Sequence, residues 1–248
     1  MGQHGQHRAL VIRVCTLVGL TLASLPAKAA ACRLALVLAM DVSSSVDEEE
    51  DRLQRAGLAA ALIAPEVQAA FLQSPEPVAL AVFEWSGRYN QAMLLDWVMI
   101  TSAQDLLASA TIIGRSKRST SEFPTALGHA VGYAATLLRR APECMAQTID
   151  VSGDGRNNEG FTPHQAYVHF PFSGVTVNGL AIETSGTTTA PETGKNISIS
   201  DYYRQHLLRG PGAFVEVAQG FEDFERAQRR KLERELGSAV FSRLEAPP

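Results

Sequence analysis

Two segments of this 248-residue chain place carboxylates and hydroxyls directly after apolar runs. Asp41, Ser43 and Ser45 follow the first run, and their alternate positions point the three side chains the same way if the segment stays extended. Asp154 follows a second apolar run at residues 145–151. Carboxylates and hydroxyls without Cys or His are hard oxygen ligands, which suit Mg²⁺ or Mn²⁺, with Ca²⁺ as a further candidate.

A third polar loop precedes a helix that we expect to begin at Pro124, because proline is favoured in the first turn. The side chains of this loop that can bind a cation are Thr120, Ser121, Glu122 and Thr125. Ligands bind outside the carboxyl ends of the strands in open α/β sheets. The three loops converge if the sheet reverses direction between the first and fourth strands.

Strand-length apolar runs alternate with helical patterns along the chain. We expect strands at 34–40, 78–84, 91–98, 145–151, 175–182 and 213–218, and helices at 51–72, 101–113, 124–140, 163–170, 200–208 and 221–236. The second and third strands are close enough to form an antiparallel hairpin. The order predicts one three-layer, doubly wound α/β domain, with a mostly parallel six-stranded sheet, one antiparallel strand and helices on both faces.

The N-terminus has the pattern of a secretory signal peptide. Arg8 and Arg13 precede a short apolar run at residues 14–25, which is followed by Ala27-Lys28-Ala29, a small-residue cleavage site. We therefore expect a signal peptide at 1–29, a domain at 32–236 and a tail at 237–248. The protein is predicted to be exported, to the periplasm or the exterior, with no membrane span after cleavage.

Charge and cysteine content fit an exported binding protein. Without residues 1–29 the chain keeps 19 basic and 26 acidic residues, which is a poor balance for binding nucleic acid. Two cysteines remain, Cys32 and Cys144. A disulfide is expected in an oxidising compartment, the alternatives being two free thiols or lipidation of Cys32.

The segments LALVLAMDVSSSVD and IDVSGDGRNNEG resemble the von Willebrand factor A family, and within it an uncharacterised bacterial branch with signal peptides. The first contains Asp41-x-Ser43-x-Ser45 and the second Asp154-Gly155, the two parts of the family's metal-ion-dependent adhesion motif. The resemblance covers about residues 32–236.

The resemblance implies roles for particular residues. Ser43 and Ser45 would bind the metal directly, and Asp41 and Asp154 directly or through water. The third-loop ligand would lie about five residues before Ala126-Leu127, which favours Ser121 over the adjacent Thr120. The family's sheet order also places Cys32 and Cys144 at the same end of adjacent strands, opposite the metal, within reach of a disulfide.

Simpler roles compete with these assignments. Ser45 is a possible N-cap for a helix that starts near Asp47. The basic residues of the last helix alternate with Glu and predict an exposed charged face; they are Arg226, Arg229, Arg230, Lys231 and Arg234. The histidines His129, His164, His169 and His206 lie on different elements and are expected to be structural or exposed.

These observations favour a non-enzymatic binding module that accepts an Asp or Glu from a partner protein on its metal. The alternative is a metal-dependent hydrolase of phosphate or ester substrates, with the metal as Lewis acid. It would need Glu122, Asp150 or Glu159 as general base, since no His lies in the three loops. A third possibility is a scaffold that has lost its metal.

Overall fold

The structure is a computed structural model that describes residues 1–2, 32–184 and 197–244. Apart from its first two residues, the expected signal peptide lies outside the described residues. Within those ranges no single helix is long and apolar enough to cross a membrane, although two consecutive helices at residues 48–72, bent by 58°, together meet the length and composition criteria.

Six strands form one sheet in the order β3-β2-β1-β4-β5-β6. Neighbouring strands are parallel except β2 and β3, which form the expected antiparallel hairpin. The strands are β1 (Cys32–Asp41), β2 (Val78–Ser86), β3 (Asn90–Ile100), β4 (Cys144–Gly153), β5 (Val175–Glu183) and β6 (Val215–Gln219). The predicted fold class, a mostly parallel six-stranded sheet, is therefore confirmed.

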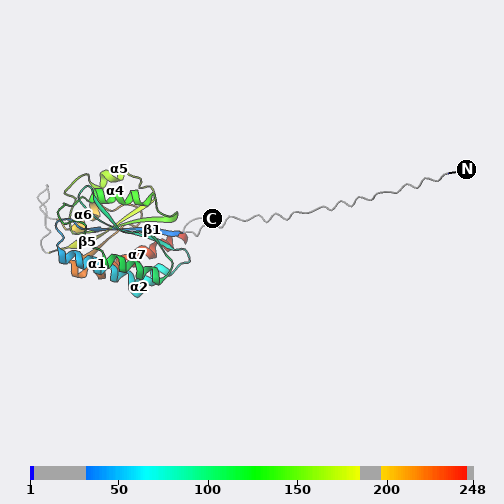
Figure 1. Ribbon diagram of the computed structural model, residues 1–248. Coiled ribbons are helices and arrows are strands. Elements are labelled where there is room, and N and C mark those ends of the chain that lie inside the picture. The colour runs from blue at the N-terminus through cyan, green and yellow to red at the C-terminus, as the bar shows by residue number, and fades with distance from the viewer. Residues whose placement is uncertain (3–31, 185–196, 245–248) are drawn as a thin grey trace.

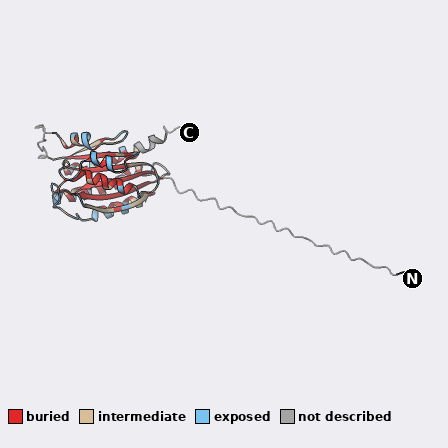
Figure 2. Cartoon of the chain, turned by 90° about the horizontal axis from the view of Figure 1, so that it is seen from above, coloured by how far each residue is buried: buried red, intermediate tan, exposed pale blue. Residues whose placement is uncertain are grey.

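Helices cover both faces of the sheet (Figure 1). One face packs against α1 (Glu48–Ile63), α2 (Pro65–Leu72), α3 (Ala103–Arg115) and α7 (Phe224–Leu244), and the other against α4 (Leu127–Leu138), α5 (Pro163–His169) and α6 (Ile199–His206). Figure 2 shows the buried residues concentrated in the strands between these layers. β1 and β2 are buried along their whole length, as expected for central strands covered on both faces.

Several helix boundaries differ from the sequence predictions. The helix expected from Pro124 begins at Leu127 instead, because the backbone of Thr125 is bound to another loop. The last helix does not end at Leu236 but continues to Leu244, into the expected tail. The helix expected at 51–72 is divided at Pro65 into α1 and α2.

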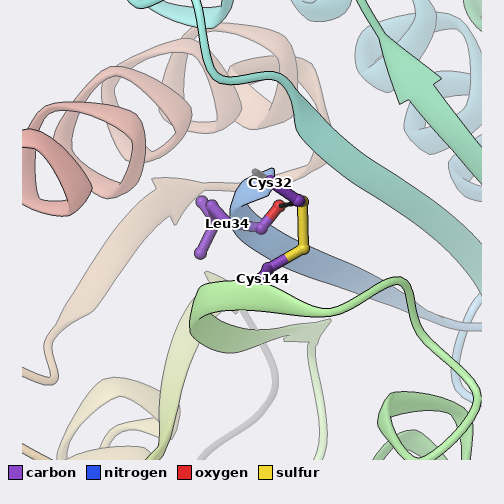
Figure 3. The surroundings of a disulfide bond; sticks show 3 residues. All are labelled: Cys32, Leu34 and Cys144. Carbon is purple, nitrogen blue, oxygen red and sulfur yellow. Dashed lines mark hydrogen bonds between the residues drawn. A yellow bond between two sulfur atoms is a disulfide. The ribbon is translucent and has the colours of Figure 1, made fainter. Parts of the chain in front are cut away.

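The sheet reverses its winding between β1 and β4, so that the loops after these strands border the crevice in which open α/β sheets bind ligands. At the opposite, amino-terminal ends of the same strands, a disulfide joins Cys32 to Cys144 (Figure 3). The two cysteines are register partners, and their Cα atoms are 4.3 Å apart. The sheet register therefore supplies the proximity on which the expected pairing depends.

Candidate metal centre

The first loop of the site begins where β1 ends, at Asp41. The amide of Ser43 donates a hydrogen bond of 2.8 Å to Asp41 Oδ1, which turns the chain out of the strand. The guanidinium of Arg118 donates to the carbonyls of Val42, Ser43 and Val46, each at 2.7 Å. Arg118 therefore fixes the loop through its backbone and leaves the Asp41 carboxylate without a bonded cation.

The N-cap of α1 is Asp47, which forms a capping box with Glu50. The possible capping role of Ser45 is thus wrong. Ser45 Oγ instead donates a hydrogen bond of 2.8 Å to Asp154 Oδ1, across 109 residues of sequence, and lies 3.2 Å from Ser43 Oγ. The first loop and the loop after β4 meet through these hydroxyls.

Thr125 supplies the third loop's contact with the cluster. Its hydroxyl donates to Ser43 Oγ at 3.2 Å, and the side chain is buried. Its amide donates to Asn158 Oδ1 at 2.8 Å, and its carbonyl accepts from the Asn158 amide at 2.9 Å. Gly155 makes room for this arrangement, because a Cβ there would lie 2.9 Å from Thr125 Oγ1.

The structure does not bring Ser121, the third-loop residue favoured from the sequence, into this cluster. Ser121 is exposed, and with Thr120 it lines a surface hollow beside Glu48 and Arg52. The hydrogen bonds of the described residues connect Thr125 to Ser43 instead. Four of the five residues expected as metal ligands therefore lie in the cluster, and the hydroxyl that the third loop brings to it is that of Thr125.

The carboxylates of Asp41 and Asp154 are close enough to affect each other electrostatically, and no Lys or Arg of the described residues forms an ion pair with either. Burial, reinforced by the neighbouring charge of Asp154, raises the pKa of Asp41 to about 8, although hydrogen bonds from Ser43 and the charge of Arg118 oppose the shift. Burial likewise raises the pKa of Asp154. Asp41 Oδ2 is buried and has no hydrogen-bond partner within the described part of the chain. Unpaired buried carboxylate oxygens are costly, and a bound divalent cation would remove this cost.

The donors suit a hard cation. The cluster contains two carboxylates and three hydroxyls, from Asp41, Ser43, Ser45, Thr125 and Asp154. Across the described ranges, no three His, Cys, Asp or Glu side chains gather into a metal site. An oxygen-only set with few carboxylates favours Mg²⁺ or Mn²⁺ that retains water ligands.

The three acids considered as general bases lie in different surroundings. Asp150 turns toward α7, where Lys231 Nζ lies 2.6 Å from its Oδ1. Glu159 forms an ion pair of 3.3 Å with Arg88, and Glu122 is exposed. None of these contacts positions a base against the cluster.

Comparison with known proteins identifies the family. Residues 31–240 match the family described as a protein of unknown function (DUF1194). The chain belongs to the DUF1194 family. No curated protein matches the sequence.

Solved structures similar to this DUF1194 chain share the von Willebrand factor A fold. A von Willebrand factor type A protein from Catenulispora acidiphila has a TM-score of 0.52 at 13% identity, over 85% of this chain and 43% of that one. BatB, a conserved hypothetical protein from Bacteroides thetaiotaomicron, has a TM-score of 0.55 at 18% identity, over 84% of this chain and 99% of that one.

A third similar structure is relevant to metal binding. Proximal thread matrix protein 1 from the mussel byssus, described with a zinc-occupied MIDAS motif, has a TM-score of 0.55 at 14% identity, over 84% of this chain and 48% of that one. The DUF1194 chain spans less than half the length of this protein and of the Catenulispora protein. At these identities the similarity establishes the fold.

Proposed function

We propose that this DUF1194 protein is an exported, non-enzymatic binding module whose metal ion accepts a carboxylate from a partner protein. Ser43, Ser45 and Thr125 would bind Mg²⁺ or Mn²⁺ through their hydroxyls. Asp41 and Asp154 would bind it directly or through water. Because the protein supplies few charged ligands, the ion would stay electrophilic enough to take an Asp or Glu side chain as its last ligand.

One observation carries this proposal: three loops bring two buried carboxylates and three hydroxyls together, and no Lys or Arg of the described residues forms an ion pair with either carboxylate. The zinc-occupied motif of the mussel protein, on the same fold, supports the choice of a divalent metal. The predicted signal peptide and the disulfide support export to an oxidising compartment. No contact in the described residues favours the hydrolase alternative.

Metal binding is tested by calorimetric titration of the purified protein with MgCl₂ and MnCl₂. We expect wild-type protein to bind, and Asp41→Asn to raise Kd by at least about tenfold, because the variant lacks the charge that neutralises the ion. Glu122→Gln is the matched control, since it removes an exposed carboxylate from the neighbouring loop and should leave Kd unchanged. Equal affinity of Asp41→Asn and wild type would show that the metal binds elsewhere.

Acceptance of a carboxylate is tested with two blocked tripeptides, Gly-Asp-Gly and Gly-Asn-Gly. We expect weak binding of the Asp peptide, with Kd of about 1 mM, in the presence of Mn²⁺. The Asn peptide should not bind, because an amide carries no charge for the metal to attract, and EDTA should abolish the signal. Equal binding of both peptides, or binding that survives EDTA, would contradict a metal bridge.

A further inference from the structure

Two glycines in adjacent strands, Gly153 of β4 and Gly179 of β5, make room for one large side chain, that of Tyr203 on α6. A Cβ at Gly179 would lie 2.7 Å from Tyr203 Cδ2, and a Cβ at Gly153 would lie 2.7 Å from Tyr203 Oη. Real Cβ atoms do not approach other atoms so closely. The phenol therefore lies against the sheet, with its ring over Gly179 and its hydroxyl beside Gly153.

The hydroxyl of Tyr203 lies close to Asp41, a residue of the candidate metal centre. The position that a Cβ would take at Gly153 is 2.7 Å from Tyr203 Oη and also 2.7 Å from Asp41 Oδ2. The two oxygens are thus close enough to share one bridging water molecule. Both are buried, and neither has a hydrogen-bond partner within the described residues. A carboxylate oxygen has two lone-pair sites, so Asp41 Oδ2 can accept a hydrogen bond from the side of Tyr203 and still face a cation on its other side.

The other oxygen of the Asp41 carboxylate, Oδ1, already accepts a hydrogen bond. Asp41 Oδ1 accepts from the Ser43 amide, so that Oδ2 alone lacks a donor. Tyr203 itself is fixed by its helix: the Ser198 hydroxyl caps α6, and the Glu183 carboxylate accepts from the amides of Ile199 and Ser200 at 3.2 and 2.9 Å. The phenol consequently has little freedom to turn away from Asp41.

We propose that Tyr203 is a positioning residue of the metal centre, whose hydroxyl donates to Asp41 Oδ2 through one water molecule and so fixes the carboxylate in its metal-binding orientation. The inference rests on the proposed function, since it assigns a role relative to that metal. Residues that hold a metal ligand in place affect metal affinity strongly, typically by 10–100-fold.

Tyr203→Phe tests this role, because it removes only the hydroxyl and keeps the ring against the two glycines. Calorimetric titration of the purified protein with MnCl₂ should show Kd raised about tenfold. The melting temperature without metal should stay within about 3 °C of wild type, since the hydroxyl has no hydrogen-bond partner among the described residues. A purely structural role would give the reverse pattern, with lower stability and unchanged Kd.

Tyr167→Phe is the matched control. Tyr167 on α5 is a partly buried tyrosine, and its hydroxyl donates to the carbonyl of Leu207. Its removal should lower stability without changing the Kd for Mn²⁺. If wild type binds Mn²⁺ and Tyr203→Phe binds it equally well, the positioning role is overturned while the metal site stands. If wild type binds no metal, the proposed function fails and this inference fails with it.

Discussion

Replacing Lys231 by Met is expected to lower the free energy of unfolding by about 3–5 kcal/mol at pH 8. Lys231 is fully buried, with Nζ 2.6 Å from Asp150 Oδ1 and 2.5 Å from Glu235 Oε1. It is the cation that holds these two buried acids of β4 and α7. Its removal would leave two uncompensated carboxylates in the interior, which costs far more than the loss of an exposed ion pair.

The loss of unfolding free energy caused by Lys231→Met should depend on pH, because Glu235 titrates. Burial raises the pKa of Glu235 to about 7, and the charge of Asp150 adds to the shift although Lys231 opposes it. An unfolded glutamate titrates near pH 4.3. Protonation of Glu235 therefore stabilises the folded protein. This stabilisation is fully present below about pH 4 and is lost as the pH rises through about 7. Without Lys231 this pKa rises further, so the deficit should be larger at pH 8 than at pH 5.

Urea unfolding at pH 5 and pH 8 measures both effects. Arg230→Met is the matched control on the same helix, because Arg230 forms a more exposed ion pair with Glu216 and should change stability by less than about 1 kcal/mol. The double variant Lys231→Met/Glu235→Gln should recover part of the loss at pH 8. A deficit no larger than that of Arg230→Met would show that the buried acids do not need the lysine.

The double variant Cys32→Ser/Cys144→Ser should lose about 4–5 kcal/mol of unfolding free energy under oxidising conditions. The bond closes a loop across a sequence separation of 112 residues, and the chain-entropy model assigns such a loop that magnitude. Urea unfolding of wild type and variant measures the loss. A thiol assay on denatured, unreduced protein without residues 1–29 should find no free thiol, and two thiols would contradict the bond.

The same disulfide variant should keep its affinity for Mn²⁺. The cysteines lie at the amino ends of β1 and β4, whereas the candidate metal residues lie at and beyond the carboxyl ends. Wild type reduced with dithiothreitol serves as a second comparison, because it should show the stability of the variant. Loss of metal binding in the folded variant would mean that the disulfide also determines the conformation of the loops at the other end of the strands.

The Asp-x-Ser-x-Ser segment and Asp154 were predictable because they follow apolar runs, and strand continuity places such residues at one edge of the sheet. The third loop was also predictable, but the side chain that it brings to the cluster, Thr125 rather than Ser121, was not. Pro124 suggested the first turn of a helix, but Thr125 is held outside α4 by Asn158, which is 33 residues away. The position of Thr125 directly before Ala126-Leu127 was the available signal, yet its long-range hydrogen bond is invisible in local sequence.

Lys231 shows the same limit for charged residues. Its alternation with Glu on the last helix predicted an exposed face, and that expectation is wrong for this residue, whose side chain is fully buried. Arg226 and Arg230 do lie on the exposed side. Alternating charges show that a helix is polar, but which charges turn inward depends on acids in other elements, here Asp150 of β4.

The disulfide and the candidate metal centre lie at opposite ends of one pair of parallel strands, β1 and β4. A pulling force applied between the candidate metal centre and Cys32 would run lengthwise along β1. Such a load would act in shear on the hydrogen bonds to both neighbouring strands, so that many would have to break together. The disulfide would pass part of this tension covalently to β4. We therefore expect the domain to resist a force applied along β1 more strongly than a force applied across the sheet.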